Sequence, residues 1–350
     1  MRRRIWVNLS ALLERGIEEG VKDISSAGFE ELLLLVSSGD GAFFNSHVRP
    51  SKPGYRASSS VEEVIREARK AGLKVHAWIV TLKFSNEDFV KKHPGWYVVN
   101  RLGESSAERP PYVKHYKWLC PRKPGVVEFV GNFFVEVASE FDLDGLHFDY
   151  IRLPDIILPK GLRAKYPEAP RRESYVPRFD FCYCCSCRRL FESETGVDPM
   201  EIGYEDPLYQ RFFRWRVDGV SRLVEKVYKA VKDVDAGLEV SAAVFPTPSI
   251  AYRYVFQNWP EWPLDLYDPM IYHRYYEKDI EWIGEAVREA VSMNAPVSAG
   301  IFLGFMEGPE DVYRAFKLAM DNGAEGITVF VYPPRKPESM EWVREAFKQL

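Results

Sequence analysis

Residues 125–151, GVVEFVGNFFVEVASEFDLDGLHFDYI, contain a helix-like segment followed at once by a strand-like one. Apolar residues recur with helical period from Gly125 to Phe141, and the run from Gly145 to Ile151 is typical of a buried strand. Such a pair is the repeating unit of α/β proteins, in which helices connect the strands of a parallel sheet.

The same alternation extends along the whole chain. Seven further strand-like runs are Ile5–Leu9, Glu31–Ser37, Lys74–Thr81, Glu239–Phe245, Leu266–Tyr272, Pro296–Phe302 and Gly326–Val331. Helical patterns lie near 11–27, at Ser60–Ala71, near 207–233, at 278–293 and 309–322, and from about 337. Eight strands alternating with helices predict an α/β fold of the (β/α)8 TIM-barrel type. An open doubly wound sheet is the alternative, disfavoured because a Gly-rich first turn is missing.

Two connections between strands and helices are unusually long, 82–123 after the third strand and 152–206 after the fourth. Both are rich in Pro, Arg and aromatic residues, and loops of this length are usually functional. Because active sites of such barrels lie at the carboxyl ends of the strands, we expect these loops to cover the catalytic face. We expect a single barrel domain over 1–350, with 152–206 as a loop insertion that carries a cysteine cluster.

Composition excludes several classes of protein. Hydrophobic residues make up 46% of the chain and charged residues 28%, as in globular proteins. The net charge of −4 and the lack of a long basic block argue against a nucleic-acid partner, and no apolar run approaches the roughly 18 residues of a membrane span. The amino terminus turns polar too early for a secretory signal, so we expect a cytoplasmic protein. Only three glutamines among many charged residues suggest thermostability. The sequence does not predict the oligomeric state.

The cysteines suggest one metal site. Four of the five lie in Cys182-Tyr183-Cys184-Cys185-Ser186-Cys187, inside the second long loop, and Cys120 lies near the end of the first. Neighbouring cysteines seldom meet disulfide geometry, whereas a tetrahedral zinc site accommodates four thiolates. We expect a structural zinc held by Cys120, Cys182, Cys184 and Cys187, although the spacing does not decide between Cys184 and Cys185. A disulfide between Cys120 and one cluster member is the alternative.

The fourth strand carries the clearest candidate for catalysis. Alternation of side chains directs His147 and Asp149 into the barrel, with Asp149 nearer the carboxyl rim. A carboxylate there is costly unless it is paired or used, so Asp149 is a candidate nucleophile or base. The alternative is an architectural ion pair between Asp149 and Arg152. His147, one layer deeper, is a candidate for substrate binding or a hydrogen-bonded core histidine.

Further acids lie near the predicted rim. Asp155 follows the fourth strand, Asp268 lies on the sixth strand below the rim, and Glu307 follows the seventh strand. Each is a candidate second carboxyl group, and each could instead be structural or simply solvated. Polar and aromatic residues that could orient or stack against a sugar are Asp40, Trp78, Arg152, Tyr272, His273 and Tyr332.

Two acids around one bond are the minimal equipment for glycoside hydrolysis, because one protonates the leaving oxygen while the other attacks or activates water. Motifs for a catalytic metal, a serine nucleophile elbow or a phosphate-binding loop are missing. The sequence therefore favours a glycosidase acting on an oligo- or polysaccharide. A carbohydrate-binding barrel without catalysis and a zinc-dependent hydrolase of another class remain the alternatives.

The fourth-strand motif DGLHFDYIRLP, Asp144–Pro154, resembles the glycosyl-hydrolase-like barrels, one bacterial group of which cleaves peptidoglycan glycan strands. Weaker similarities follow in the same order along the chain, at Val75–Trp78, Trp118–Pro121, Gln257–Tyr272, Gly323–Gly326 and Phe330–Tyr332. The resemblance implies a (β/α)8 barrel that acts on glycosidic bonds. It places Asp149 where α-amylase and α-galactosidase barrels carry their nucleophile, and it matches Asp155 to an acid that often follows this strand.

The cysteine pattern departs from that family. It resembles the family 42 β-galactosidases, whose zinc is bound by one upstream cysteine and a Cys-x-Cys-x-x-Cys motif, matched here by Cys120 with Cys182, Cys184 and Cys187. Those enzymes use paired glutamates. The strand ends of this chain show no matching pair, so their activity is not implied.

Overall fold

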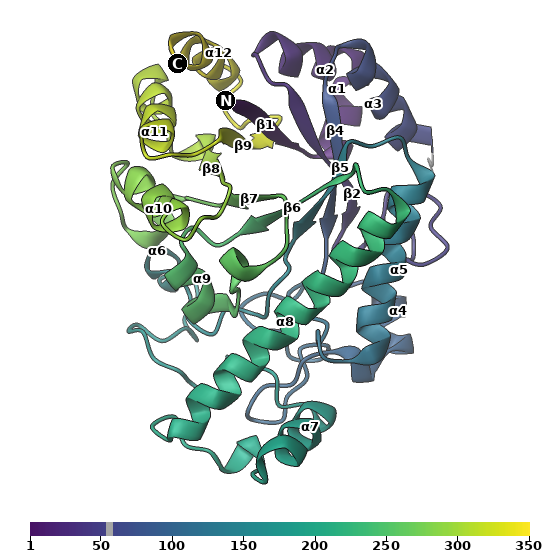
Figure 1. Ribbon diagram of the computed structural model, residues 1–350, viewed down its shortest axis with the longest axis vertical. Helices are drawn as coiled ribbons and strands as arrows, with labels where there is room; N and C mark the ends of the chain where they lie inside the picture. Colours follow the sequence, from purple (N-terminus) through teal and green to yellow (C-terminus); the bar gives the residue numbers. More distant parts are fainter. Residues whose placement is uncertain (54–58) are drawn as a thin grey trace.

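The computed structural model describes residues 1–53 and 59–350. Within these ranges, eight parallel strands follow one another in the order β7-β6-β5-β4-β2-β1-β9-β8 (Figure 1). Their bounds are β1 (Arg2–Val7), β2 (Glu31–Ser38), β4 (Lys74–Val80), β5 (Gly145–Asp149), β6 (Glu239–Val244), β7 (Leu266–Pro269), β8 (Ser298–Phe302) and β9 (Gly326–Tyr332). A short strand, β3 (Gly41–Ala42), pairs antiparallel with the end of β2.

Backbone contacts between β7 and β8 close the barrel. Tyr267 and Met270 form parallel bridges with Val297 and Gly300. The Tyr267 N–H donates to the Pro296 carbonyl at 3.0 Å, and the Ile271 N–H donates to the Gly300 carbonyl at 2.9 Å. The predicted (β/α)8 barrel is therefore confirmed, and the open sheet is excluded.

Helices follow the strands and pack outside them. Those of the barrel are α1 (Leu9–Arg15), α2 (Ile17–Ser26), α3 (Ser59–Lys70), α5 (Pro124–Glu140), α8 (Pro207–Val234), α9 (Pro248–Val255), α10 (Trp282–Val291), α11 (Pro309–Asp321) and α12 (Ser339–Gln349). The single helix expected near 11–27 is broken at Gly16, whose φ of 100° ends α1. The first strand ends before the expected Leu9 because the Asn8 side chain caps α1. Helix α9 was not predicted from the sequence.

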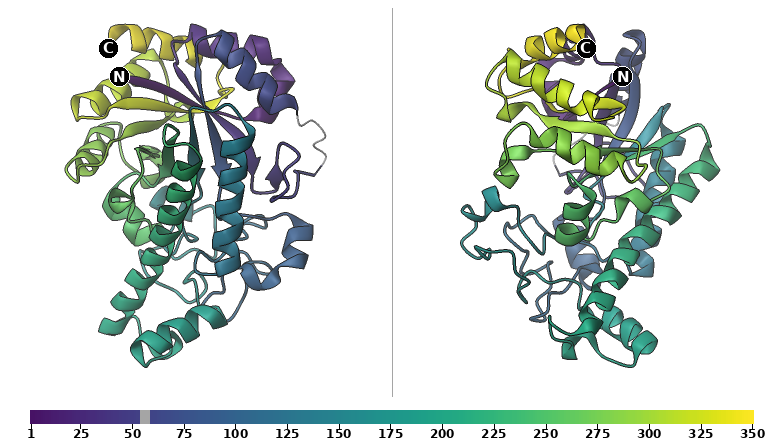
Figure 2. Two further views of the ribbon diagram at one scale, coloured as in Figure 1. Left: turned by 45° about the vertical axis from the view of Figure 1, so that its right-hand side comes forward. Right: turned by 60° about the vertical axis from the view of Figure 1, so that its left-hand side comes forward.

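The two long loops form a lobe beyond the carboxyl ends of the strands, at the bottom of Figure 1. They contain the short helices α4 (Glu87–Lys92), α6 (Lys160–Arg163) and α7 (Cys185–Thr195). Helix α8 leads from this lobe back to the barrel, and Figure 2 shows it running beside α5. Its start is fixed by the Asp206 cap and by Pro207 in the first turn.

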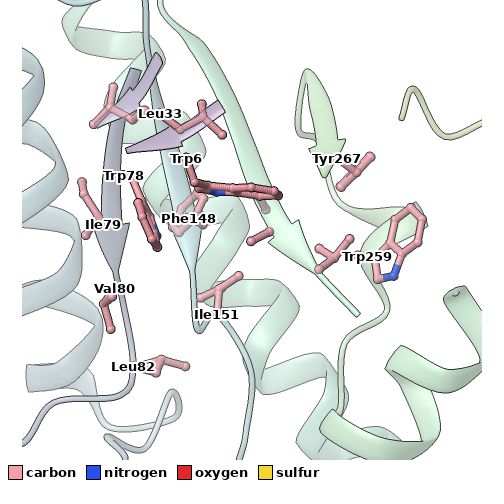
Figure 3. Packing of buried hydrophobic residues seen from close by; sticks show 14 of the residues in the cluster. Trp6, Leu33, Trp78, Ile79, Val80, Leu82, Phe148, Ile151, Trp259 and Tyr267 are labelled. Atoms are coloured by element: carbon pink, nitrogen blue, oxygen red, sulfur yellow. The ribbon is translucent and has the colours of Figure 1, made fainter. Parts of the chain in front are cut away.

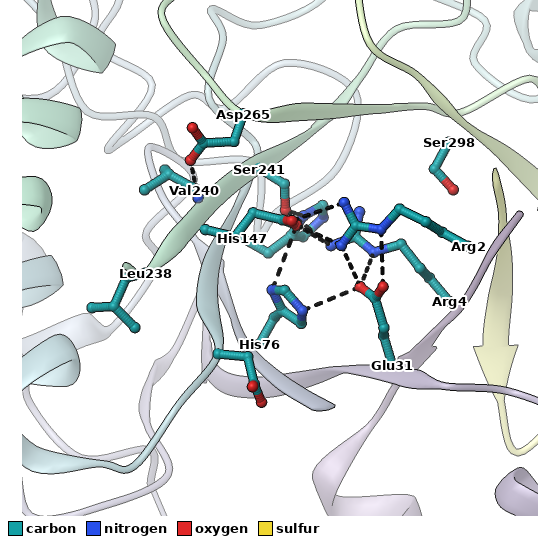
Figure 4. Close-up of polar contacts among 12 residues, drawn as sticks. Arg2, Arg4, Glu31, His76, His147, Leu238, Val240, Ser241, Asp265 and Ser298 are labelled. Atoms are coloured by element: carbon teal, nitrogen blue, oxygen red, sulfur yellow. Dashed lines mark hydrogen bonds and ion pairs between the residues drawn. The ribbon is translucent and has the colours of Figure 1, made fainter. Parts of the chain in front are cut away.

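Charged side chains fill the part of the barrel interior that lies towards the amino ends of the strands (Figure 4). Arg4 on β1 is fully buried and donates to both carboxylate oxygens of Asp268, at 2.8 and 2.6 Å. Its Nε lies 3.1 Å from Glu31, and His76 Nε2 lies 3.2 Å from the same carboxylate. These contacts join strands from opposite sides of the barrel and close its floor.

A buried layer separates this floor from the carboxyl rim. The Trp6 indole N–H donates to His147 Nε2 at 3.0 Å, and His147 Nδ1 lies 2.9 Å from the Ser241 hydroxyl. Figure 3 shows Trp6 among the buried hydrophobic residues of this region, with Trp78 and Ile151. Because the floor and this layer fill the lower part of the barrel, space for a ligand remains at the carboxyl ends of the strands.

Candidate active site

A cavity of about 420 Å³ opens at the carboxyl ends of β4, β5, β7 and β9, beneath the two long loops. Half of its lining residues are aromatic. The aromatic side chains that line it are Trp78, Tyr112, Tyr116, Tyr150, Tyr166, Phe245, Tyr272, Tyr275, Tyr276 and Phe330. Its volume is within the range of small-ligand sites, and its flat walls suit ring-shaped ligands.

Asp149, the last residue of β5, lies in this cavity and forms no ion pair with any described residue. Its Oδ2 accepts a hydrogen bond from the Trp78 indole at 2.9 Å, and its Oδ1 accepts one from the Tyr150 N–H at 2.7 Å. Tyr150 has a φ of 51°, an uncommon backbone conformation that is frequent at functional sites. Among the described residues, no arginine, lysine or histidine lies within ion-pair distance of Asp149.

Burial raises the pKa of Asp149 above the usual range of an aspartate. The two N–H donors, and the charges of Arg152 and Lys83 beyond ion-pair distance, oppose this shift. Asp149 is only 7% exposed, yet it lines the cavity. It is therefore a polar group that structural contacts leave only partly satisfied.

Arg152 pairs with Asp155 rather than with Asp149. Its guanidinium lies 3.0 Å from Asp155 Oδ2 and donates to the Tyr116 hydroxyl at 2.8 Å. The same group lies against the rings of Trp118 and Phe245, at 4.7 and 4.9 Å from their centres. Asp155 also lines the cavity, which makes it the second carboxyl group of this wall.

Tyr272 lines the same cavity and carries a hydroxyl group that no described residue binds. Its oxygen is buried and has no hydrogen-bond partner among the described residues. Burial raises the pKa of this phenol well above its usual range, so the proton stays on the oxygen. A bound ligand could satisfy this donor, whereas nothing in the described part of the protein does.

Three other candidates lie away from the cavity. Asp268 and His147 belong to the closed lower part of the barrel, where burial keeps the pKa of His147 well below its usual range. Glu307 is 75% exposed and pairs with Arg274 at 2.7 Å. The structure therefore does not bring Asp268 or Glu307 next to Asp149.

Tyr332 points away from the barrel mouth because of a β-bulge. Between Ile5 and Val7 of β1, strand β9 advances from Val329 to Tyr332, so one extra residue shifts the alternation. The Tyr332 hydroxyl donates to Asp23 at 3.0 Å, and Phe330 lines the cavity instead. His273 packs against Phe305 and is not part of the cavity wall. Asp40 lines a neighbouring hollow.

The four expected cysteine ligands come together in the lobe. Cys120, Cys182, Cys184 and Cys187 are buried, and their sulfurs all lie within 4.8 Å of one another. All five cysteines are free thiols, and Cys185 is exposed outside the cluster. Zinc–sulfur bonds of about 2.3 Å at tetrahedral angles place sulfurs about 3.8 Å apart. The Cys120–Cys187 distance of 3.5 Å is close to that value, so the four thiols fit one metal ion.

Another group with metal-ligating side chains, Glu31, His76 and Glu239, lies at the floor of the barrel. Its carboxylates are already occupied, because Arg2 lies 2.6 Å from Glu31 and 2.8 Å from Glu239. This group therefore serves as a network of ion pairs.

The model of a known family, glycosyl hydrolase-like 10, matches residues 17–307, which is more than half of the chain. The chain belongs to this glycosyl hydrolase-like family. Among the described residues of this family member, no helix combines the length and apolar character needed to cross a bilayer.

Individual proteins are similar to this family member over different lengths. Glycosyl hydrolase DigH of Escherichia coli K12 is 31% identical over 108 residues, which are 28% of this chain and 23% of DigH. The glycoside hydrolase domain of PgaB from Bordetella bronchiseptica has the same fold, with a TM-score of 0.74 over 99% of this chain and 98% of that domain, at 15% identity. A β-galactosidase from Marinomonas ef1 has a TM-score of 0.66 at 10% identity, covering 100% of this chain and 59% of that enzyme.

Several cavity residues of this glycosyl hydrolase-like barrel were not identified from the sequence. Tyr112 and Tyr116 come from the first long loop, and Tyr275 and Tyr276 follow β7. The high aromatic content of the loops was the available signal. It could not show which rings face the cavity, because the loops lack the regular period that assigns faces on strands and helices.

Proposed function

We propose that the protein is a glycoside hydrolase in which Asp149 acts as nucleophile or general base. The observation that carries this proposal is a carboxylate without a cationic partner, held by the Trp78 and Tyr150 N–H groups and exposed to an aromatic cavity. Donors on both oxygens hold the carboxylate in position and stabilise its charged form. Membership of a glycosyl hydrolase-like family supports the same activity.

The cavity supplies the other elements of a two-carboxyl mechanism. Asp155 is the second acid in its wall, so the pair would divide proton transfer to the leaving oxygen from attack on the sugar. The unpaired Tyr272 hydroxyl would donate to a sugar oxygen. The rings of Trp78 and Phe330 would pack against the sugar faces and exclude water.

One observation favours a second candidate function, carbohydrate binding without catalysis. Asp155 is engaged by Arg152 and by the Tyr116 hydroxyl, so among the described residues of this wall Asp149 alone is a carboxyl group without an ion pair. Most glycosidases use two carboxyl groups, one on each side of the scissile bond. A sugar could therefore bind in the cavity without being cleaved.

Product release separates the two functions. The purified protein is incubated with peptidoglycan glycan strands, chitin, amylose and β-glucans, and new reducing ends are measured beside the thermal melting temperature. An enzyme produces reducing ends from at least one polymer. A binding module is stabilised by a polymer but releases no product. If no polymer is hydrolysed and none raises the melting temperature, both candidate functions are contradicted.

We also propose that Cys120, Cys182, Cys184 and Cys187 hold a structural zinc ion. Four thiolate ligands leave no open position for water, so the metal would join the loops and take no part in hydrolysis. Cys120 lies at the end of the first loop, and the other three cysteines lie at the start of α7 and just before it. The ion would thus fasten both walls of the cavity to each other.

A further inference from the structure

A second hollow lies beside the aromatic cavity, near the ends of β2 and β4. It encloses about 800 Å³, and its wall is mostly polar. The polar residues of this wall include Asp40, Ser85, Asn86, Glu108, Lys114 and His115. Its chemistry therefore differs from that of the aromatic cavity, and it suits a ligand with many hydroxyl groups.

The two hollows share a wall. Tyr112 and Tyr116 line the aromatic cavity, whereas Lys114 and Lys117 of the same segment line the polar hollow. His115 lines both. The segment 112–117 is therefore the ridge between them, and the two spaces meet at His115.

The floor of the polar hollow is fixed by cross-links between loops. The Ser85 hydroxyl donates to the Asp40 carboxylate at 2.8 Å, and the Asn86 amide donates to the Asp40 carbonyl at 2.9 Å. Asn86 is buried, and its own oxygen caps α4 by accepting from the Phe89 N–H at 3.1 Å. The Asp40 carboxylate is therefore held in place before any ligand arrives.

Two charged side chains of this hollow are unpaired among the described residues. Glu108 and Lys114 form no ion pair among the described residues, and both are exposed. A free carboxylate and a free amine beside the fixed Asp40 offer both acceptors and a donor to one ligand. Sugar hydroxyls require such a mixture because each both donates and accepts.

We infer that the polar hollow binds the sugar units next to the one held over Asp149, so that the substrate is a chain crossing the ridge at His115. This inference rests on the proposed function. It predicts that the protein prefers longer oligosaccharides, since each added unit that reaches the hollow contributes binding that a dimer lacks. It also assigns Asp40 and Lys114 to substrate binding outside the catalytic cavity.

The test measures kcat/KM against chain length. Size-fractionated oligosaccharides from dimer to hexamer are prepared from peptidoglycan glycan strands, or from chitin, amylose or β-glucan if that polymer is the one hydrolysed. We expect kcat/KM to rise by about tenfold or more from dimer to hexamer. Asp40→Ala and Lys114→Ala should each reduce the hexamer-to-dimer ratio about three- to tenfold, because each removes a contact that only the longer chain reaches.

Asp142→Ala is the matched control, because this aspartate is 87% exposed and lies outside both hollows. It should leave the hexamer-to-dimer ratio unchanged. Hydrolysis whose rate is the same for dimer and hexamer, or whose length dependence survives both variants, would overturn the inference. Failure to hydrolyse any polymer would instead contradict the proposed function, so the two outcomes are distinguishable.

Discussion

The carboxylate of Asp149 lies among aromatic rings, where a charge is costly, and its structural partners are two N–H groups rather than a cation. Arg152, the nearest guanidinium along the chain, is committed to Asp155. Alternation on the fourth strand was enough to predict that Asp149 faces the barrel interior. It could not predict the partner of Arg152, because that choice depends on how the loop after β5 folds back.

The hydrogen bond from the Trp78 indole lowers the pKa of Asp149. Trp78→Phe removes the donor to Asp149 Oδ2 and keeps most of the ring. Because the hydrogen bond stabilises the charged form, its loss should raise the pKa of Asp149 further. A nucleophile or base works only when deprotonated, so the acidic limb of the kcat/KM profile should move to higher pH.

Trp259→Phe provides the control for this profile. The Trp259 indole is fully buried, but its N–H has no acceptor among the described residues. The limb should keep its position in that variant. A Trp78→Phe profile that coincides with the wild-type profile would show that Asp149 does not set the limb.

Among the elements, the strands lie where their apolar runs predicted them. The faces of the loop residues could not be predicted, and the face of Tyr332 at the end of β9 was predicted wrongly. Tyr332 was expected at the rim, but the bulge in β9 directs it outward. A shift of one residue moves every following side chain to the other face of a strand, and the sequence of residues 326–332 contains no signal for this bulge. The cysteine spacing was more informative, because few arrangements satisfy four thiols so close in sequence.

The two long loops should depend on their shared metal site. Cys187→Ser removes one of the four ligands, whereas Cys185→Ser alters an exposed thiol outside the cluster. We expect about one zinc per chain in the wild type and in Cys185→Ser, and a clear loss in Cys187→Ser. The melting temperature of Cys187→Ser should fall by about 5 °C or more. Equal zinc content and equal melting temperatures in both variants would contradict a structural zinc.

At the scale of the whole molecule, eight units in strict alternation predicted a parallel α/β sheet, and the missing Gly-rich first turn favoured its closure into a barrel over an open sheet. The charged floor could not be predicted in the same way. Arg4, Glu31, His76 and Asp268 are far apart in sequence, and only closure brings them together.

The ion pairs of the floor should contribute to the free energy of unfolding. Arg4→Met leaves the fully buried Asp268 carboxylate without its cation, which should lower the free energy of unfolding by about 3–5 kcal/mol in urea titrations. Arg314→Met breaks the ion pair of a 61% exposed arginine with Glu281 and should change little. Similar losses in the two variants would mean that the buried pair does not hold the barrel together.

Replacement of Asp149 by Asn tests whether this carboxyl group performs catalysis. The amide keeps an oxygen for the Trp78 donor and nearly the same volume, so the melting temperature and the binding of the hydrolysed polymer by calorimetry should persist. Hydrolysis by the same preparation should fall by about a thousandfold or more, because the attacking or water-activating group is gone. Turnover equal to that of the wild type would contradict the account.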